Sequence, residues 1–377
     1  MRKFKIAILT ESVSSHSGAR APVEIAKNLA KFGYEVEIFA KKGKHDLKLI
    51  RELTKFKVKT VLLDSPKTLM SRFLPNLELL GILKKQKPDL AILAAQLPYH
   101  LSAKLAQIKT VRIYMGTQFN AYLEKKLPDE QINILDQLIN FTSNLIIYLS
   151  EFISNWIAEE IVAISIYCAG EIRRLYKKDA DQVIYLGGDH LPSVPKALNS
   201  PRSHGLRLIS VSRITPYKGF HHLLKAVELV KNKKPIQLII VGSIDKSKYL
   251  NYLKQKAPAN VQILVNPNDL QLAKLYAQSD IYLTADSNLF FGFPIAEASF
   301  LKKPTIAFDF KAARELVKNK KTGILVKNTR QMAQAIEYLA RNPKILNHYG
   351  QAAYRLAHQN FTWRKVSQKY AKFLKGA

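Results

Sequence analysis

The segment Leu208-Ile-Ser-Val-Ser-Arg-Ile-Thr-Pro-Tyr-Lys-Gly-Phe220 decides how this sequence folds. Its first half is a short apolar run, typical of a buried parallel strand that ends at Ser212. A loop then carries Arg213 and Lys218, and Gly219 leads into a helical stretch. Two cations at the carboxyl end of a strand can hold a diphosphate, because arginine offers a planar fork of donors and lysine a point charge. If the loop stood alone, two exposed surface cations would be the simpler interpretation.

A second strand-to-helix loop strengthens the anion-binding interpretation. Asp286-Ser-Asn-Leu-Phe-Phe-Gly-Phe-Pro-Ile-Ala-Glu-Ala298 follows an expected strand at Ile281–Thr284. Gly292 permits a tight turn, and Pro294 suits the first position of a helix, whose N-terminus attracts anions. Glu297 lies one turn further and could accept hydrogen bonds from a vicinal diol such as a ribose. Taken alone, a glutamate at this place would more simply stabilise the helix dipole.

Outward from these loops, short β-rich runs alternate with helical stretches along the whole chain. This alternation predicts βαβ units in doubly wound α/β sheets. Between the first two strands, Val23–Phe32 has the spacing of an amphipathic helix that ends at Gly33. The expected strands are Phe4–Leu9, Glu35–Ala40, Val58–Leu63, Leu90–Ala94, Thr110–Tyr114, Ile161–Ser165, Gln182–Leu186, Arg207–Ser212, Gln237–Val241, Val261–Val265, Ile281–Thr284, Thr305–Phe308 and Gly323–Val326.

A break in this rhythm marks a domain boundary. Leu191–Gly205 contains three prolines and shows no apolar periodicity. We therefore predict a Rossmann-like domain at 1–190, a linker at 191–205 and a second Rossmann-like domain at 206–360. The last segment, 361–377, forms a helix that could pack on either domain. Ligands of such sheets bind outside the carboxyl ends of the strands, so we expect the site in the cleft between the two domains.

The composition narrows the class of protein. The chain has 377 residues, of which 47% are hydrophobic, so two folded domains are expected. Its single cysteine, Cys168, excludes an intramolecular disulfide framework and a cysteine-rich metal site. No signal peptide or membrane-spanning run is expected, and a reducing cytosol fits best.

The charge is unusual and unevenly distributed. The formal net charge is +30, and residues 191–377 contribute +22 of it, with 31 basic and 9 acidic residues. Such a balance favours phosphorylated substrates, nucleic acid or a membrane surface as partners. A general lysine bias on solvated faces is an equally good explanation, because the lysines are scattered.

The stretch 127–172 has no lysine or arginine. Within it, 141–157 has an apolar helical pattern. One interpretation is a helix that faces a membrane or a partner. Interfacial helices usually carry a basic polar face, however, so a core helix of the first domain is the favoured prediction.

A third small-residue loop, Thr10-Glu-Ser-Val-Ser-Ser-His-Ser-Gly-Ala-Arg20, lies between the first strand and the first helix. Together the three loops resemble those of the family 4 retaining glycosyltransferases, which have the GT-B fold. The resemblance covers nearly the whole chain. It also includes Ala163-Ile-Ser165, Val183-Ile-Tyr-Leu-Gly-Gly-Asp189, Leu272–Asp280, Ala313-Arg-Glu-Leu-Val317 and Thr322-Gly-Ile-Leu-Val326.

The resemblance implies a role for each matching residue. Arg213 and Lys218 would bind the diphosphate of a nucleotide-sugar donor and stabilise the leaving group, and Glu297 would bind the ribose. The backbone at Gly292, Phe293 and Pro294 would lie near the donor, and Gly18 near its phosphates. The first domain would take the acceptor and the second the donor, and the last helix would cross back onto the first domain.

Two positions depart from the family pattern. Leu289 stands where the family has the first glutamate of its Glu-x7-Glu motif, which usually contacts the donor sugar. Met115 stands near a position where many members have a histidine. Candidate sugar or acceptor contacts are therefore the polar residues around these two places, together with position 289 itself: Thr117, Gln118, Asn120, Asp286, Asn288 and Leu289.

The resemblance implies a metal-independent, retaining transferase that moves a sugar to a saccharide or lipid-linked acceptor in cell-surface glycan synthesis. We expect no cofactor, no metal and no nucleic-acid partner. A bacterial cytoplasmic location is expected, with peripheral contact to the anionic inner face of the membrane as an option. The alternative is a catalytically impaired relative that serves as a binding or scaffold partner, which the departures at Leu289 and Met115 would suit.

Overall fold

The computed structural model describes residues 3–14, 17–43, 45–64, 70–117, 119–195, 205–231, 235–244 and 247–376. It consists of two compact units. Unit 1 comprises Met1–Phe119, Thr142–Leu186 and Trp363–Ala377, and unit 2 comprises Asn120–Phe141 and Gly187–Thr362. The first domain was predicted to span 1–190, but residues 120–141 belong to unit 2.

Unit 1 is built on a seven-stranded parallel sheet with the order β3-β2-β1-β4-β5-β6-β7. Most of its strand ends lie within two residues of the predicted ones, but β7 ends three residues early. The strands are β1 Lys5–Thr10, β2 Glu35–Lys41, β3 Lys59–Leu63, β4 Leu90–Ala94, β5 Thr110–Tyr114, β6 Glu160–Ala163 and β7 Gln182–Val183. Its helices are α1 Arg20–Lys31, α2 Leu47–Lys55, α3 Leu77–Gln86, α4 Leu97–Leu105, α6 Ile166–Tyr176 and α14 Trp363–Gly376.

Helix α1 shows how the sequence pattern becomes packing. It begins three residues before the predicted start and buries Ile25, Ala26 and Leu29. Phe32, predicted on the same buried face, is instead the C-terminal cap residue and is exposed. The chain then turns at Gly33 with φ of 94°, a conformation that glycine adopts without strain. Helix α14 packs against α1, so the end of the chain belongs to unit 1.

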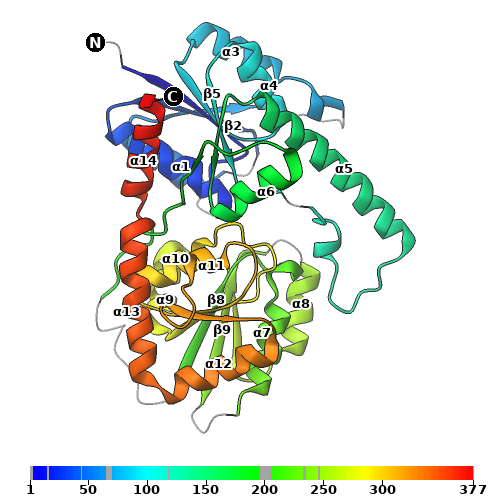
Figure 1. Cartoon of the computed structure of the whole chain (residues 1–377), viewed down its shortest axis with the longest axis vertical. Helices are drawn as coiled ribbons and strands as arrows, with labels where there is room; N and C mark the ends of the chain where they lie inside the picture. The colour runs from blue at the N-terminus through cyan, green and yellow to red at the C-terminus, as the bar shows by residue number, and fades with distance from the viewer. Residues whose placement is uncertain are drawn as a thin grey trace. The chain divides into compact units, whose positions relative to one another are not determined.

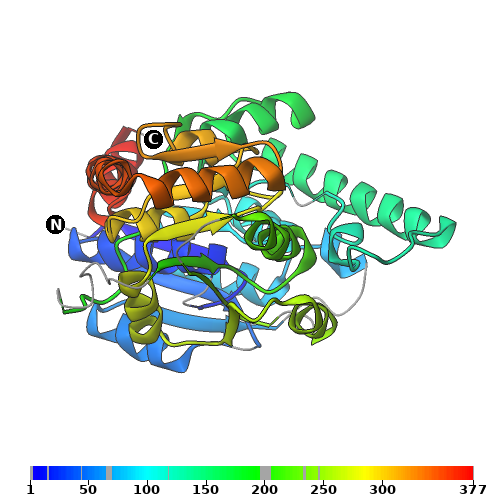
Figure 2. The ribbon, with the colours of Figure 1, turned by 90° about the horizontal axis from the view of Figure 1, so that it is seen from below.

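Unit 2 is built on a six-stranded parallel sheet with the order β10-β9-β8-β11-β12-β13. Helices cover both faces of this sheet (Figures 1 and 2). The strands are β8 Leu206–Val211, β9 Ile236–Gly242, β10 Val261–Val265, β11 Ile281–Thr284, β12 Thr305–Phe308 and β13 Gly323–Val326. The helices are α7 Phe220–Leu229, α8 Ser247–Lys256, α9 Asp269–Gln278, α10 Phe293–Phe300, α11 Ala313–Leu316, α12 Thr329–Arg341 and α13 Pro343–Asn360. The two parallel sheets confirm the predicted α/β class.

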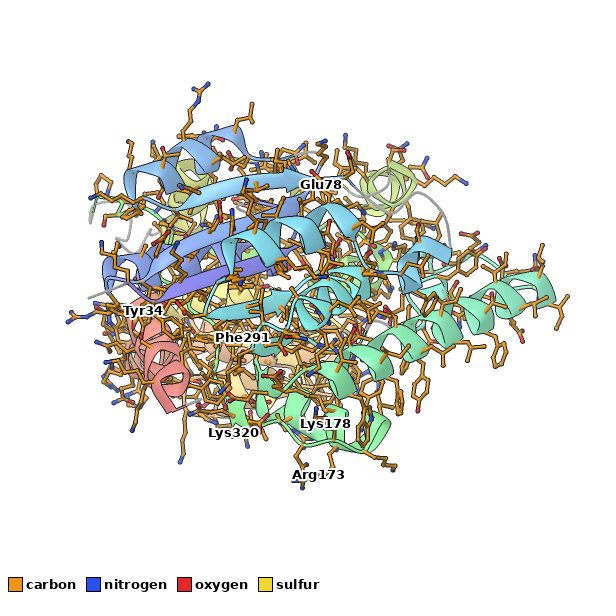
Figure 3. The ribbon with its side chains drawn as sticks, turned by 90° about the horizontal axis from the view of Figure 1, so that it is seen from above. Tyr34, Glu78, Arg173, Lys178, Phe291 and Lys320 are labelled. Atoms are coloured by element: carbon orange, nitrogen blue, oxygen red, sulfur yellow. The ribbon has the colours of Figure 1, made fainter. Side chains whose placement is uncertain are left out.

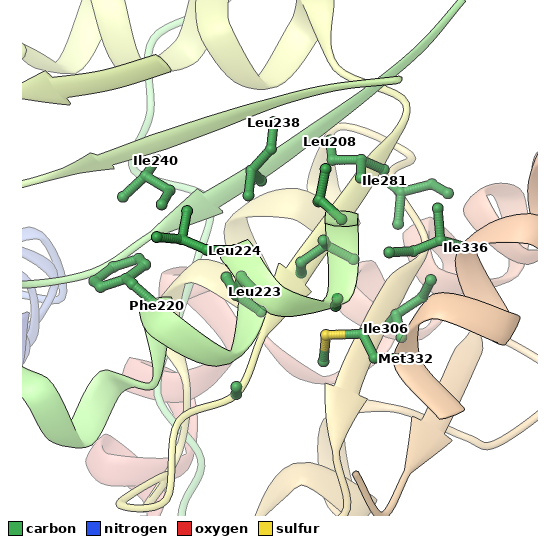
Figure 4. Close-up of a cluster of buried hydrophobic side chains, with 14 of the residues drawn as sticks. Leu208, Phe220, Leu223, Leu224, Leu238, Ile240, Ile281, Ile306, Met332 and Ile336 are labelled. Atoms are coloured by element: carbon green, nitrogen blue, oxygen red, sulfur yellow. The ribbon is translucent and has the colours of Figure 1, made fainter. Parts of the chain in front are cut away.

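One face of the second sheet packs against α7, α8 and α12 (Figure 4). Phe220 and Leu223 of α7 and Met332 of α12 meet Leu208 and Ile240 of the sheet, and all five side chains are fully buried. Burying side chains of this size stabilises a domain by about 1.5–3 kcal/mol each. This core fixes the ends of β8 and β11, from which the two motif loops emerge.

Helix α5, Ile134–Ile157, differs from the prediction of a core helix. All of its residues are described, and none of its hydrophobic side chains is fully buried. Its buried side chains are polar: Asp136, Asn140, Ser154 and Asn155. The core-helix prediction is therefore wrong, because an apolar spacing defines a face without defining what that face contacts. Within the described part of the chain, no helix is long and apolar enough to span a membrane.

Candidate functional site

The order of the strands in unit 2 creates one place where neighbouring loops diverge. From the central strand β8 the chain runs outward through β9 and β10, and it then returns to β11 on the other side of β8. The crevice outside the carboxyl ends of β8 and β11 is therefore the topological switch point of this sheet, the usual ligand site of such folds. Both motif loops identified in the sequence, 212–219 and 285–292, follow these two strands.

The loop after β8 lies directly against the end of β11. Gly219 has φ of 71° and is the N-terminal cap of α7. A Cβ atom at this position would lie 2.4 Å from the carbonyl oxygen of Ala285. The backbone N–H of Ser287 donates to the carbonyl oxygen of Tyr217 over 3.2 Å, which ties the two loops together. Glycine is thus required here for both its conformation and its size.

The two predicted cations lie on this loop in different surroundings. The guanidinium of Arg213 donates from one terminal nitrogen to the hydroxyl of Tyr217 at 2.5 Å. Its Nε is buried and has no hydrogen-bond partner among the described residues. The ammonium of Lys218 donates to Oδ2 of Asp286 at 2.6 Å. An unsatisfied buried donor is costly, and an acceptor supplied by a ligand would remove that cost.

The loop after β11 is folded by its own polar groups. Oδ1 of Asp286 accepts from the backbone N–H of Asn288 at 2.8 Å, while its Oδ2 holds Lys218. Gly292, with φ of 98°, is the N-terminal cap of α10 and has no side-chain cap. The helix begins at Phe293, so Pro294 occupies its second position where the sequence predicted the first. Because its carboxylate holds the ammonium of Lys218, Asp286 is part of the cation site.

Leu289 is buried in the same loop. A Cβ atom on Gly292 would lie 3.0 Å from Cδ1 of Leu289, so the leucine packs under the turn that starts α10. The carbonyl oxygen of Leu289 accepts from the backbone N–H of Ala312 at 3.0 Å. Its side chain thus fills space beneath the loop with apolar atoms.

Glu297 lies one turn into α10, as predicted, and is buried. Its Oε2 accepts from the hydroxyl of Tyr276 at 2.9 Å, and its Oε1 lies 3.1 Å from Nε2 of His190. Burial raises the pKa of Tyr276, so this hydroxyl remains a donor. The segment that carries His190 approaches α10 closely, since a Cβ on Gly188 would lie 2.5 Å from Cβ of Ala296. Each carboxylate oxygen retains a second lone pair that could accept from a ligand hydroxyl.

A further carboxylate in unit 2 was not predicted from the sequence. Glu124 lies in the short helical turn η3, Leu123–Lys125, and its carboxylate accepts from the side-chain amide of Asn288. The ammonium of Lys311 donates to Oδ1 of the same amide. Burial raises the pKa of Glu124, and the charges of Lys311 and Lys218 oppose that shift. No sequence signal could have linked Glu124 to Asn288, because 164 residues separate them.

The predicted contacts from the first half of the chain divide between the two units. In unit 1, a Cβ on Gly18 would lie 3.7 Å from Sδ of Met115, so the first loop lies against the loop after β5. The hydroxyl of Thr117 is buried and contacts the hydroxyls of Tyr114 and Tyr176 at 2.6 and 2.7 Å. Its role in unit 1 is thus at least partly structural. In unit 2, Asn120 accepts from the side chain of Asn140. Gln118 lies outside the described residues.

Unit 1 has its own switch point, between β1 and β4. Glu11, in the loop after β1, accepts from the backbone N–H of Gln96, after β4, at 2.7 Å. Burial raises the pKa of Glu11. Glu11 lies within the predicted small-residue loop, but nothing in the sequence distinguished it from other surface glutamates.

Among the described residues there is no group of three or more His, Cys, Asp or Glu side chains that could hold a metal ion. The cluster formed by Arg213, Lys218 and Lys311 with Asp286 and Glu124 instead has an excess of positive charge. Such an arrangement suits an anionic ligand.

Comparisons with known proteins agree with this geometry. Residues 199–356 match the family described as "Glycosyl transferases group 1". A trehalose synthase of Pyrococcus horikoshii is 25% identical over 178 residues, which are 44% of this chain and 43% of that protein. An uncharacterized glycosyltransferase of Methanocaldococcus jannaschii is 23% identical over 274 residues, 70% of this chain and 67% of that protein. The chain thus spans less than half the length of the first of these relatives.

Solved structures share the fold across the full chain. A glycosyltransferase from Rickettsia africae superposes with a TM-score of 0.74 at 22% identity, covering 100% of this chain and 99% of that one. Anabaena HepE, in complex with UDP and glucose, gives 0.75 at 17% identity, covering 99% and 100%. These similarities show the GT-B fold. The part of the chain that contains both loops of the switch point, residues 199–356, therefore resembles the group 1 glycosyl transferases.

Proposed function

We propose that the protein transfers a sugar from a nucleoside-diphosphate sugar, with retention of anomeric configuration and without a metal ion. The observation that carries this proposal is the Arg213 guanidinium. Its Nε is buried without a partner among the described residues, beside Lys218, at the switch point of unit 2. A diphosphate supplies the planar pair of acceptors that the guanidinium fork requires.

Each residue of the site has a task in this reaction. Arg213 and Lys218 bind the diphosphate and stabilise the charge that develops on it as the bond to the sugar breaks. The N-terminus of α10, at Gly292–Pro294, lies near the donor, and Glu297 accepts hydrogen bonds from the ribose. Because the cations are fixed before the reaction, they stabilise the leaving group without reorganisation.

The sugar end of the donor meets a different set of groups. Leu289 is buried, and the side chain of its neighbour Asn288 contacts the side chains of Glu124 and Lys311. We propose that these three polar side chains bind hydroxyl groups of the transferred sugar. The acceptor is proposed to be a saccharide or a lipid-linked saccharide in cell-surface glycan synthesis.

A panel of nucleotides tests the proposal. Purified protein is heated with UDP, GDP or ADP, with and without EDTA, and its unfolding midpoint is measured. One nucleotide should raise the midpoint selectively, and EDTA should leave that shift unchanged. If no nucleotide raises the midpoint, the donor site is refuted and the scaffold alternative is favoured. A shift that EDTA abolishes would refute metal independence.

A further inference from the structure

Helix α5 has its hydrophobic face turned outward. Seven exposed hydrophobic side chains recur along it at intervals of three or four residues and form one stripe, here called the α5 stripe: Ile134, Leu138, Phe141, Leu145, Leu149, Phe152 and Trp156. At 1.5 Å per residue the stripe is roughly 33 Å long. The side chains are between 38% and 81% exposed. An exposed apolar face of this length is typical of a site that contacts a membrane or another protein.

The buried face of α5 explains why the stripe is not a packing error. Asp136 accepts from the hydroxyl of Tyr122 and pairs with Lys126, each at 2.8–2.9 Å. Glu151, further along, pairs with Arg112 at 2.5 Å. These polar contacts help to hold the helix to the protein. This anchoring leaves the apolar residues for a different environment.

Basic residues border the stripe, but they come from the next helix. The ring of Tyr148 stacks on Tyr176 of α6 at 5.6 Å, and the indole N–H of Trp156 donates to the carbonyl oxygen of Tyr176. The end of α6 is therefore beside the second half of α5. Exposed basic residues follow there at Arg173, Arg174 and Lys177, and Lys178 lies 6.0 Å over the Trp156 ring. Figure 3 shows Arg173 and Lys178 on the same side of the molecule.

We infer that the α5 stripe docks on an anionic lipid bilayer, with its apolar side chains between the acyl chains and the basic end of α6 at the headgroups. Interfacial helices combine an apolar face, aromatic residues and basic neighbours in this manner. The stretch 127–172 has no basic residue, which argued against a membrane in the sequence, but α6 supplies the missing charge at 173–178. The overall charge of +30 favours an anionic surface over a second, equally charged copy of the chain.

This inference extends the proposed function, since a lipid-linked acceptor is reached at a membrane. The two can nevertheless fail separately, because vesicle binding needs no nucleotide and nucleotide binding needs no vesicle. Both are therefore measured on the same protein.

The test is co-sedimentation of the full chain with vesicles of phosphatidylcholine, alone or with phosphatidylglycerol. The chain should bind the anionic vesicles much more tightly, and added salt should weaken that binding. Leu145→Gln with Leu149→Gln should lower the vesicle partition coefficient roughly 30-fold, because two half-exposed leucines lose their transfer into the bilayer. Leu77→Gln, which alters an exposed leucine of α3, is the matched control and should bind as the wild type does.

Fluorescence gives a second readout at the stripe itself. The chain has two tryptophans, and Trp156 is exposed while Trp363 is buried. Anionic vesicles should shift the Trp156 emission to shorter wavelength, and brominated lipids should quench it. Equal binding of the wild type and the double variant would overturn the inference. So would a wild-type dimer that the double substitution converts to a monomer, with no vesicle binding, because the stripe would then pair two copies.

If vesicle binding fails while nucleotide binding is normal, only the docking surface is refuted. If nucleotide binding fails while the vesicles bind, only the transferase proposal is refuted.

Discussion

Replacing Arg213 with alanine removes the group on which the donor site depends. The guanidinium has one hydrogen bond to Tyr217 and a buried Nε without a described partner, so two donors can face a diphosphate. A hydrogen bond to a charged group contributes about 1.5–3 kcal/mol. Losing two such bonds, at the lower end of this range, costs about 3 kcal/mol, which corresponds to a roughly 150-fold higher Kd for the nucleoside diphosphate.

Isothermal titration calorimetry with the nucleotide that stabilises the wild type measures this change. Arg213→Lys should recover part of the affinity, because it keeps the charge but loses the fork. Arg341→Ala is the matched control, since this arginine is 63% exposed and pairs with Glu337 on the same helix. A folded Arg213→Ala protein with wild-type affinity would refute the placement of the diphosphate.

Three other perturbations test the physical basis of the site. Gly219→Ala should destabilise unit 2 by more than about 2 kcal/mol in urea unfolding, because its Cβ meets Ala285 at a positive φ, whereas Gly81→Ala in the open space of α3 should not; equal effects would contradict the loop packing. Glu124→Gln should keep or raise the free energy of unfolding at pH 7 by up to about 1 kcal/mol. Burial raises the pKa of Glu124 above 4.5, so the protonated carboxyl stabilises the folded state at pH values below 4.5. This stabilisation is lost as the pH rises through the raised pKa of the folded state. A large loss of stability in the Glu124→Gln variant at pH 7 would contradict this pH dependence. Burial lowers the pKa of His221 from 6.5 to about 4, so protonation of His221 reduces the free energy of unfolding by up to about 3 kcal/mol as the pH falls from 6.5 to 4. The variant His221→Asn should therefore lose less stability over this pH range than the wild type. An equal loss of stability in both proteins would show that other groups control the acid unfolding.

Much of the fold could be predicted because the apolar runs and the order in which they alternate with helical segments indicate the same fold class. The continuous apolar runs specify parallel strands, and the chain alternates them with helices often enough to exclude other classes. Strand β11 at Ile281–Thr284 and strand β12 at Thr305–Phe308 occur where predicted. Strand β7 ends at Val183, although Ile184 is buried and its backbone N–H still donates to the carbonyl oxygen of Ala163 in β6, so a local apolar pattern cannot distinguish this residue from a strand residue.

The cation loop could be predicted because it is local in sequence. Arg213, Lys218 and Gly219 lie within seven consecutive positions after one strand, and their chemistry is evident from residue type. Asp286 was identified as a polar candidate, but its pairing with Lys218 depends on β8 and β11 being neighbours. Glu124 could not be found, since its position next to Asn288 is a property of the folded unit alone.

The outward face of α5 was missed for a different reason. The apolar spacing of an amphipathic helix indicates that one side is apolar, but it does not indicate whether that side contacts protein, lipid or solvent. The decisive observation was the burial of Asp136, Asn140, Ser154 and Asn155, which only the folded chain reveals.

Cleavage of the donor tests the central claim most directly. The full chain is incubated with UDP-, GDP- and ADP-sugars in EDTA, where water takes the sugar in place of the acceptor, and release of the nucleoside diphosphate is followed by chromatography for the wild type and Arg213→Ala. We predict that one donor releases its nucleotide in the wild type, at a rate about 100-fold or more above that of the variant. Wild-type protein that binds a nucleotide but cleaves none of its sugars, or a variant that cleaves as fast as the wild type, would contradict the assignment of this site as a transferase centre.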